Sequence, residues 1–352
     1  MTFDCIVVGS HLRFDGVWQR PQQIVTRLAE RVPVLFVEEP FAAAIDRDEV
    51  REERGVTIVR PLRRNARGAA PADAATLATA RAWAGARRTL VWLYTPMMAA
   101  LEALASDGML VYDCMDELAG FAFAPDAMAA READLTARAR LVFAGGKSLY
   151  EARRAEGGAK VRLYPSGVEY DHFARARTLP RHPLAAHLEP PVCGYIGAID
   201  ERIDFALVEA LAARGANVVM VGPVVKIDAA TLPRRANVHF TGQMPYAELP
   251  ALLAGFDVAI MPFAINAATT FISPTKTPEY LAAGRPVVSS PIADVVASYG
   301  DVVTIADSPE AFAEACLAVR IDPARDARAS ERAHAAGWDA IVARMWSDLE
   351  RE

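Results

Sequence analysis

Short apolar runs alternate with helical patterns along most of the chain, and this alternation constrains the fold more than any other feature. The expected strands form two series, at 5–9, 34–37, 56–59, 90–94, 110–113 and 141–144, and at 192–197, 218–221, 238–241, 258–262, 286–289 and 302–305. Helical patterns lie between them, for example at 21–31, 136–140, 205–214 and 246–254. Strands that are apolar throughout are typical of parallel sheets covered on both faces. The sequence therefore predicts an α/β protein with two doubly wound, Rossmann-like domains.

A boundary between the two domains is expected at 175–191. This stretch has little periodicity and contains four prolines, Pro180, Pro183, Pro190 and Pro191. A chain of 352 residues is also longer than one ordinary core requires. We therefore expect domains at 1–174 and 192–331, followed by an amphipathic C-terminal helix at 332–352 that carries Trp338, Ile341, Met345, Trp346 and Leu349 at helical spacing.

Composition and charge exclude several classes of protein. The formal net charge of −6 argues against a dedicated nucleic-acid binder, and no apolar run approaches the ~20 residues that a membrane helix needs. The sequence enters its first expected strand directly, without a signal peptide, so we expect a cytoplasmic protein. The cysteines Cys5, Cys114, Cys193 and Cys316 are far apart and are expected to be buried free thiols. The histidines show no metal-binding spacing, so we expect no metal and no cofactor.

Basic residues concentrate between positions 51 and 90. Nine arginines (51, 54, 60, 63, 64, 67, 81, 87 and 88) face only three acidic residues in this segment, Glu52, Glu53 and Asp73. One interpretation is a solvated, Arg-rich helix and loop. The other is an electropositive face for an anionic acceptor or for an acidic membrane surface, which would make the protein peripheral at the inner membrane face.

The segment 273–288 has the features of a phosphate-binding turn. Thr277 is expected to be the N-cap, Pro278 the first helical residue, and Gly284 the residue after the helix. Lys276 adds a positive charge to the N-terminal end of this helix, and the carboxylate of Glu279 could accept hydrogen bonds from sugar hydroxyls. The alternative is an ordinary αβ turn with a capped helix.

The same segment resembles a known family motif. The run Pro274-x-Lys276-x-x-Glu279-Tyr280-Leu281-Ala282-x-Gly284-x-Pro286-Val287-Val288 is similar to the donor-site motif of GT-B glycosyltransferases, especially those of family 4. Tyr164-Pro165-Ser166-Gly167-Val168-Glu169-x-x-x-Phe173 resembles the element that leads into their second domain. The resemblance implies a GT-B fold, in which two domains face a cleft and the last helix crosses back to the first domain.

The resemblance also implies roles for individual residues. Lys276, with Thr275 beside it, would contact the diphosphate of a nucleotide sugar, and Glu279 would bind the ribose. Family 4 enzymes usually carry a second glutamate eight residues earlier, where this chain has Phe271. The usual glutamate contact to the donor sugar is therefore not expected here.

Other loops of the second domain are expected to meet at the carboxyl edge of its sheet, where ligands of open parallel sheets bind. Gly197 lets the backbone approach a ligand closely, and Arg202 could reach a phosphate or instead pair with Asp200 or Asp204. In the resembled enzymes, the turn at Gly242 and Gln243 holds the nucleobase. Pro262 ends a further strand at this edge.

In the first domain, the loop at 9–23 is rich in polar and aromatic residues. Its members His11, Arg13, Trp18 and Arg20 are candidates for contact with the acceptor or the leaving phosphate. His11 is also a candidate catalytic residue, and its alternative is an ordinary surface histidine.

Asp113 and Asp116 follow the expected strand at 110–113 and are candidates for the catalytic base. Asp116 matches the proposed base of xanthan-type glucuronosyltransferases. The alternative for either aspartate is capping of a helix N-terminus.

Taken together, the resemblance implies a glycosyltransferase that moves a sugar from a nucleotide sugar to a glycan, lipid-linked or small-molecule acceptor. Two alternatives remain open at this point. One is a nucleotide-sugar epimerase of the same fold, and the other is a non-catalytic protein that binds nucleotide or glycan.

Overall fold

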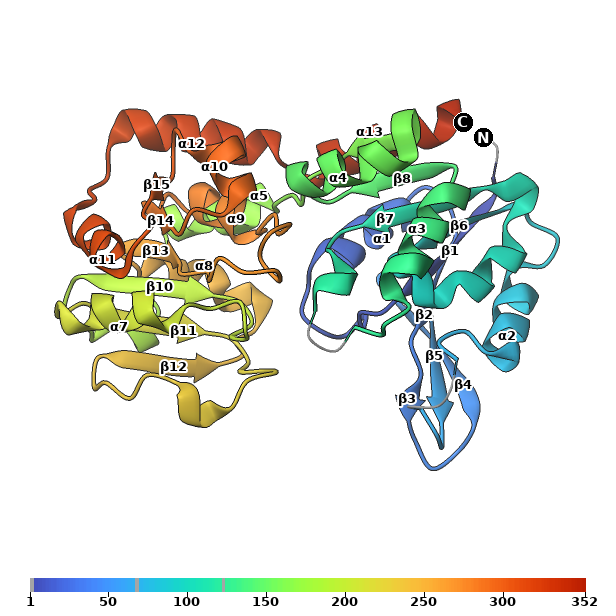
Figure 1. Cartoon of the computed structure of the whole chain (residues 1–352), viewed down its shortest axis with the longest axis horizontal. Coiled ribbons are helices and arrows are strands. Elements are labelled where there is room, and N and C mark those ends of the chain that lie inside the picture. The colour runs from blue at the N-terminus through green and yellow to red at the C-terminus, as the bar shows by residue number, and fades with distance from the viewer. Residues whose placement is uncertain (1–2, 67–69, 122–123) are drawn as a thin grey trace. The chain divides into compact units, whose positions relative to one another are not determined.

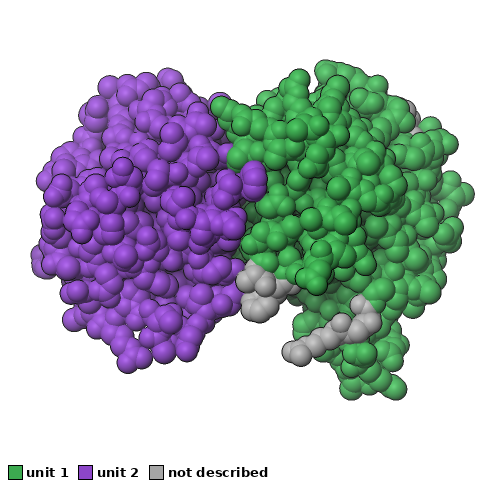
Figure 2. Space-filling view, viewed as in Figure 1, with its two compact units in different colours: residues 1–166, 338–352 green, residues 167–337 purple. Residues whose placement is uncertain are grey.

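The computed structural model describes residues 3–66, 70–121 and 124–352 (Figure 1). The chain forms two compact units (Figure 2). Unit 1 comprises Met1–Ser166 and Trp338–Glu352, and unit 2 comprises Gly167–Gly337.

Unit 1 is built on a mostly parallel sheet in the order β3-β5-β2-β1-β6-β7-β8-β9, with β4 paired to β5. Its strands are β1 (Cys5–Ser10), β2 (Val34–Glu38), β3 (Phe41–Ala42), β4 (Arg47–Glu53), β5 (Val56–Arg63), β6 (Thr89–Leu93), β7 (Leu110–Cys114), β8 (Leu141–Ala144) and β9 (Val161–Leu163). The central strands are buried along their whole length, as expected for a sheet covered on both faces.

Three strands of unit 1 lie outside the predicted series. β3 and β9 are only two and three residues long. β4 runs antiparallel to β5 and is mostly exposed, with the charged sequence RDEVREE. Such short or charged strands bury few side chains and lack the apolar signal on which the prediction was based.

The helices of unit 1 are α1 (Arg20–Ala29), α2 (Ala74–Ala84), α3 (Met128–Arg138), α4 (Lys147–Gly157) and α13 (Trp338–Arg351), with 3₁₀ segments at Pro96–Leu104, Ser106–Gly108, Leu118–Gly120 and Gly158–Lys160. The expected helix at 136–140 is wrong in its extent. It is the last turn of α3, and residues 139–140 lead into β8.

The C-terminal helix returns to unit 1, as the resemblance implied, but the expected span of 332–352 is too long. Residues 332–335 belong to α12 (Pro323–Ala335) in unit 2, and α13 begins at Trp338 after Gly337. The apolar face of α13 packs against α1, and the rings of Trp346 and Phe3 meet edge to face with centroids 5.5 Å apart. This buried face is what joins the last residues of the chain to the first unit.

Unit 2 contains a fully parallel sheet in the order β12-β11-β10-β13-β14-β15. The strands are β10 (Val192–Ile196), β11 (Asn217–Val221), β12 (Val238–Gly242), β13 (Val258–Met261), β14 (Val287–Ser289) and β15 (Thr304–Ile305). The strand order reverses between β10 and β13, which creates the switch point where open α/β sheets bind ligands. All six strands correspond to the second predicted series.

The helices of unit 2 are α5 (Tyr170–Ala174), α6 (Pro183–Ala186), α7 (Phe205–Ala213), α8 (Leu249–Ala254), α9 (Lys276–Ala282), α10 (Ala293–Tyr299), α11 (Pro309–Ala318) and α12, with 3₁₀ segments at Arg175–Arg177, Ala229–Thr231 and Tyr246–Glu248. The Pro-rich stretch at 175–191 lies inside unit 2. Ala176 and Ala185 are buried in its core, as is Phe173 just before the stretch, whereas the change of unit falls between Ser166 and Gly167.

All four cysteines are buried free thiols, which confirms that prediction. In the part of the chain that the structure describes, no helix is both long and apolar enough to span a membrane.

Candidate functional site

Three glycines tie the carboxyl ends of neighbouring strands together in unit 2. The N–H of Gly197, after β10, donates to the carbonyl of Val221 (2.8 Å), and the N–H of Gly222, after β11, donates to the carbonyl of Gly242 in β12 (2.9 Å). A Cβ on Gly222 would lie 2.0 Å from the carbonyl oxygen of Gly197, and φ at Gly222 is +143°. Only glycine fits such a close approach of two backbones.

Lys276 lies against this glycine edge. A Cβ on Gly197 would lie 2.6 Å from the Lys276 Nζ, so the ammonium group occupies the space beside the Gly197 backbone. Nζ is also 5.4 Å from the ring centroid of Tyr195 and 5.9 Å from that of Phe263. Two predicted donor residues, Gly197 and Lys276, are thus brought together although they are far apart in the sequence.

The helix that carries Lys276 begins earlier than expected. α9 starts at Lys276, with Thr275 as an N-cap residue whose side chain makes no capping hydrogen bond. Thr277, the predicted N-cap, is buried, and its hydroxyl donates to the Met261 Sδ (3.4 Å). Pro278 is consequently the third helical residue, where its missing N–H is still tolerated.

The C-terminal end of α9 agrees with the prediction. Gly284 has φ +69°, and its N–H donates to the Leu281 carbonyl (3.1 Å), while the N–H of Arg285 donates to that of Tyr280 (3.1 Å). These two bonds are the Schellman arrangement, which needs a left-handed residue just after the helix. In addition, the Tyr280 hydroxyl accepts a hydrogen bond from the N–H of Ile196 (2.8 Å), which fixes α9 against the end of β10.

Glu279 is half-buried on α9, and its environment raises the pKa of its carboxyl group to about 7. Burial is the main cause, the nearby positive charge of Lys276 opposes the shift, and the negative charge of Glu169 adds to it. The carboxylate of Glu169 in turn accepts a hydrogen bond from the Tyr246 hydroxyl (2.7 Å), and the ring of His172 stacks on Tyr246 with centroids 4.5 Å apart.

Glu169 and Gly222 were missed as site residues. Glu169 stands in the quoted run at 164–173, and Gly222 directly follows an expected strand. Both signals were present in the sequence, but only the fold shows that these residues lie near Glu279 and Gly197.

Arg202 makes the contact that was expected as its alternative role. Its Nε and Nη2 donate to the two carboxylate oxygens of Asp200, at 2.9 and 2.6 Å. Burial of Asp200 opposes its ionisation, but the Arg202 hydrogen bonds prevail and hold the pKa of Asp200 below its usual range. Arg202 is therefore at the predicted edge of the sheet, with most of its guanidinium turned to Asp200.

The remaining predicted donor residues lie on neighbouring loops of unit 2. The carbonyl of Pro262 accepts a hydrogen bond from the N–H of Asp204 (2.8 Å), which joins the loops after β13 and β10. Gly242 and Gln243 are exposed at the end of β12, and Thr275 and Phe271 are half-buried on the segment before α9.

Two of the residues predicted for catalysis and acceptor binding form a buried ion pair in unit 1. Arg20 is 1% exposed and Asp113 is 0% exposed. The Arg20 Nε donates to Asp113 Oδ1 (2.9 Å), and its Nη1 donates to the carbonyl of Tyr164 (2.7 Å). The predictions of Asp113 as a base and of Arg20 as an acceptor contact are therefore wrong, because neither side chain reaches the surface.

The other predicted residues of unit 1 are more accessible. Asp116 is half-buried after β7 and caps neither of the next two helical segments, so the alternative capping role is not observed for it. His11 is half-buried in the loop after β1. Arg13 donates to the carbonyl of Pro40 (3.0 Å), and the guanidinium of Arg54 lies 4.3 Å from the Trp18 ring centroid.

The arginines of segment 51–90 are largely paired with acidic residues from elsewhere in unit 1. Arg60 contacts Glu38 and Asp15, and Arg88 contacts Asp4. Further pairs are Arg51–Asp15, Arg63–Asp48 and Arg64–Asp46, while Arg67 lies outside the described residues. The fold therefore offsets much of the positive charge that the segment carries in the sequence.

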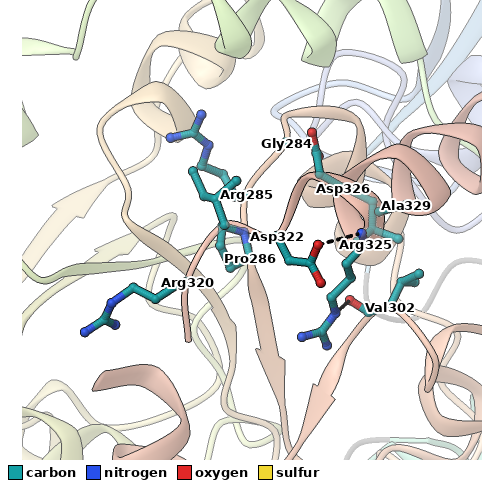
Figure 3. A pocket seen from close by; sticks show the side chains of 11 residues that line it. Gly284, Arg285, Pro286, Val302, Arg320, Asp322, Arg325, Asp326 and Ala329 are labelled. Carbon is teal, nitrogen blue, oxygen red and sulfur yellow. Dashed lines mark hydrogen bonds between the residues drawn. The ribbon is translucent and has the colours of Figure 1, made fainter. Parts of the chain in front are cut away.

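A solvent-open hollow with about 330 Å³ of empty space lies in unit 2 at the C-terminal end of α9, opposite to the end that carries Lys276 (Figure 3). Its wall includes Gly284, Arg285, Asp322, Arg325 and Asp326 and none of the predicted donor residues. Asp322 accepts a hydrogen bond from the N–H of Arg325 (3.3 Å), and Asp326 is paired outside the hollow with Arg177 (2.7 Å). The carboxylates of Asp322 and Asp326 thus already have partners within unit 2.

Comparisons with known proteins agree with this geometry. Residues 190–322 match the family model described as "Glycosyl transferases group 1". The structure of sucrose-phosphate synthase from Thermosynechococcus elongatus superposes with a TM-score of 0.73 and 15% identity, over 99% of this chain and 98% of that one. The structure of HepE from Anabaena in complex with UDP and glucose superposes with a TM-score of 0.73 and 14% identity, over 99% of this chain and 100% of that one. The chain has the GT-B fold.

A curated relative extends the comparison beyond the GT-B architecture. The putative teichuronic acid biosynthesis glycosyltransferase TuaH of Bacillus subtilis (strain 168) is 27% identical over 224 residues, which are 59% of this chain and 56% of the relative. The match thus spans about half the length of the curated relative.

Across residues 3–66, 70–121 and 124–352, no three His, Cys, Asp or Glu side chains group in a way that could hold a metal ion.

The buried pair in unit 1 generates a stability prediction. Asp113→Ala should lower the free energy of unfolding by about 3–5 kcal/mol, because it leaves the Arg20 guanidinium buried without a counter-ion. Urea unfolding of the full chain measures this loss. The matched control is Asp134→Ala, which removes an exposed partner of Arg138 and should cost about 0–1 kcal/mol. Equal losses for the two variants would contradict the structural role.

The raised pKa of Glu279 predicts how stability depends on pH. In the folded protein the carboxyl group keeps its proton up to about pH 7, whereas in the unfolded chain it loses the proton near its ordinary pKa of about 4.3. The wild type should therefore lose stability relative to Glu279→Gln as the pH rises through this window, by up to about 1.4 kcal/mol per pH unit, and the difference should level off above pH 7.

Urea titrations of the wild type and Glu279→Gln at pH 5, 6, 7 and 8 measure this difference. Subtracting the free energy of unfolding of one protein from that of the other at each pH removes the contributions of groups that titrate in both. A difference that stays constant over these four pH values would show that the Glu279 carboxyl has an ordinary pKa.

Proposed function

We propose that the protein is a glycosyltransferase that moves a sugar from a nucleoside diphosphate to a hydroxyl group of an acceptor. The observation that carries the proposal is the position of the Lys276 ammonium group beside the Gly197 backbone, at the switch point of the unit 2 sheet. A positive charge and a close backbone approach at this edge suit a diphosphate. Both residues lie within the segment that matches glycosyl transferases group 1.

The donor residues have distinct proposed roles. Lys276 binds the diphosphate and stabilises the negative charge that develops on it as the bond to the sugar breaks. Glu279 accepts hydrogen bonds from the ribose hydroxyls, with Glu169 and Tyr246 beside it. The exposed turn at Gly242 and Gln243 contacts the nucleobase. UDP is the first nucleotide to test, because the HepE structures hold UDP and UDP-glucose.

In the transfer step, the bond between the sugar C1 and the phosphate oxygen breaks, and C1 forms a bond to the acceptor oxygen. The phosphate leaves with the bonding electrons, and the acceptor hydroxyl loses its proton. In an inverting enzyme Asp116 takes this proton, and in a retaining enzyme the leaving phosphate can take it. We assign acceptor contacts to unit 1, where Asp116, His11, Arg13 and Trp18 are the available residues.

The class of acceptor and the site of action are proposed from the name of a relative and from the charge of unit 1. A glycan or lipid-linked acceptor agrees with the name of TuaH, a putative glycosyltransferase of teichuronic acid biosynthesis. The exposed members of the Arg-rich segment 51–90 would support peripheral contact with the inner face of the membrane. A metal-independent reaction in the cytoplasm is proposed, with Lys276 supplying the charge that a metal ion would otherwise provide.

Lys276→Ala should weaken binding of UDP by about 10- to 100-fold and leave binding of uridine nearly unchanged, since a charge-assisted contact to phosphate has no counterpart in a nucleoside. Calorimetric titration of both ligands measures the two effects. Arg214→Ala is the matched control, because it removes a cation of the same unit that pairs with Glu314 on the surface. A similar loss of affinity for UDP and for uridine would contradict the proposed contact between Lys276 and the diphosphate.

Product analysis tests the proposed reaction itself. A transferase should release nucleoside diphosphate from a nucleotide sugar in proportion to added acceptor, and NMR of the product gives the anomeric outcome. A changed sugar without acceptor would instead select an epimerase. Binding without either product, over a panel of donors and acceptors, would select a non-catalytic role.

A further inference from the structure

The carboxylate of Glu201 has no hydrogen-bond partner within the described residues. Both of its oxygens are shielded from solvent, so the exposed quarter of the side chain is carbon. The cation paired with it is Lys226, whose Nζ lies 3.9 Å from Oε1 and so beyond hydrogen-bond distance. A shielded carboxylate without hydrogen bonds costs free energy, and in a native structure it calls for a specific explanation.

Glu201 lies where three loops of unit 2 meet. The loop after β10 pairs with the loop after β11 through Ile199 and Val224, and with the loop after β13 through Ile203 and Phe263. The side-chain amide of Asn266, also after β13, donates to the Glu201 carbonyl (3.4 Å). This is the same carboxyl edge of the sheet that carries Gly197 and Lys276.

The described neighbours of Glu201 do not donate hydrogen bonds to its carboxylate. Its neighbour Arg202 donates to Asp200 instead. Lys226 stands on a left-handed backbone with φ +61°, a conformation that is costly for a residue with a side chain and that is often found where a ligand is bound. Glu201 and Lys226 are therefore held in costly arrangements on adjacent loops.

We propose that Glu201, with Lys226 beside it, is a specificity-determining residue that accepts hydrogen bonds from the hydroxyl groups of the donor's sugar. An ionised carboxylate only accepts hydrogen bonds, so its ligand must present N–H or O–H groups. The diphosphate presents none and is repelled by the negative charge, whereas the sugar presents several hydroxyls. The inference rests on the proposed function, because it assumes a nucleotide sugar at this edge of unit 2.

A comparison of UDP and UDP-glucose isolates the contribution of the sugar. In calorimetric titrations of the full chain, Glu201→Gln should weaken binding of UDP-glucose by about tenfold, because the charged acceptor is lost. Binding of UDP should stay unchanged or become slightly tighter, because a negative charge near the diphosphate is removed. The matched control is Glu209→Gln on α7, where an exposed carboxylate pairs with Arg235. This control should leave the affinities for both ligands unchanged.

Thermal unfolding of the ligand-free variant gives an independent readout. If Glu201 serves a ligand, Glu201→Gln should keep or raise the Tm, because a neutral amide is less costly to shield than an unbonded carboxylate. A role in stabilising the fold predicts a lower Tm instead. A lowered Tm together with unchanged affinity for UDP-glucose would overturn the proposal.

The remaining outcomes separate this inference from the proposed function. If the wild type binds UDP and UDP-glucose, and Glu201→Gln changes both affinities alike or neither, the sugar contact is wrong while the donor site stands. If the wild type binds neither, the same comparison is made with GDP and GDP-mannose. Absence of binding to both pairs would overturn the donor site and the sugar contact together.

Discussion

The close contact between the backbones of Gly197 and Gly222 is the constraint on which the arrangement of the unit 2 site depends. The ends of β10, β11 and β12 are drawn together because two glycines leave no side chain between the strands. The Lys276 ammonium group occupies the other side of Gly197. A side chain at position 197 would displace the lysine, and one at position 222 would separate the strand ends. The position of the one full positive charge on α9 thus depends on the absence of a Cβ atom at Gly197.

The electrostatics of α9 result from opposing effects, of which burial of the Glu279 carboxyl group is the largest. Burial and the negative charge of Glu169 favour a protonated Glu279, and Lys276 favours an ionised one. The result is a carboxyl group with a pKa of about 7, in the first turn of a helix that the Tyr280 hydroxyl fixes against β10. A group in this state changes its charge readily when a ligand alters its surroundings, which is a property found at many binding sites.

Unit 1 uses buried charges for a different purpose. Arg20 and Asp113 form an ion pair in its core, and Arg153 contacts Glu132 and Glu117 in a second buried group. Such pairs rarely add much stability over apolar packing, but removing one member is costly. Acidic residues at the carboxyl end of a strand can therefore serve the fold as well as chemistry. Asp113 serves the fold, and Asp116, three residues later, is the residue that remains accessible.

The sequence by itself determined the class of fold, the strands of unit 2, the Schellman end of α9 and the GT-B resemblance, because apolar periodicity, glycine and proline act over a few neighbouring residues. It did not determine that Arg20 and Asp113 would meet in a core, since an ion pair between residues 93 positions apart leaves no local pattern. Nor did it predict the charged strand β4, the inclusion of 175–191 in unit 2 or the unbonded carboxylate of Glu201. Burial and partners at these places are set by segments that meet only in the folded protein, and that is why only the tertiary structure decided them.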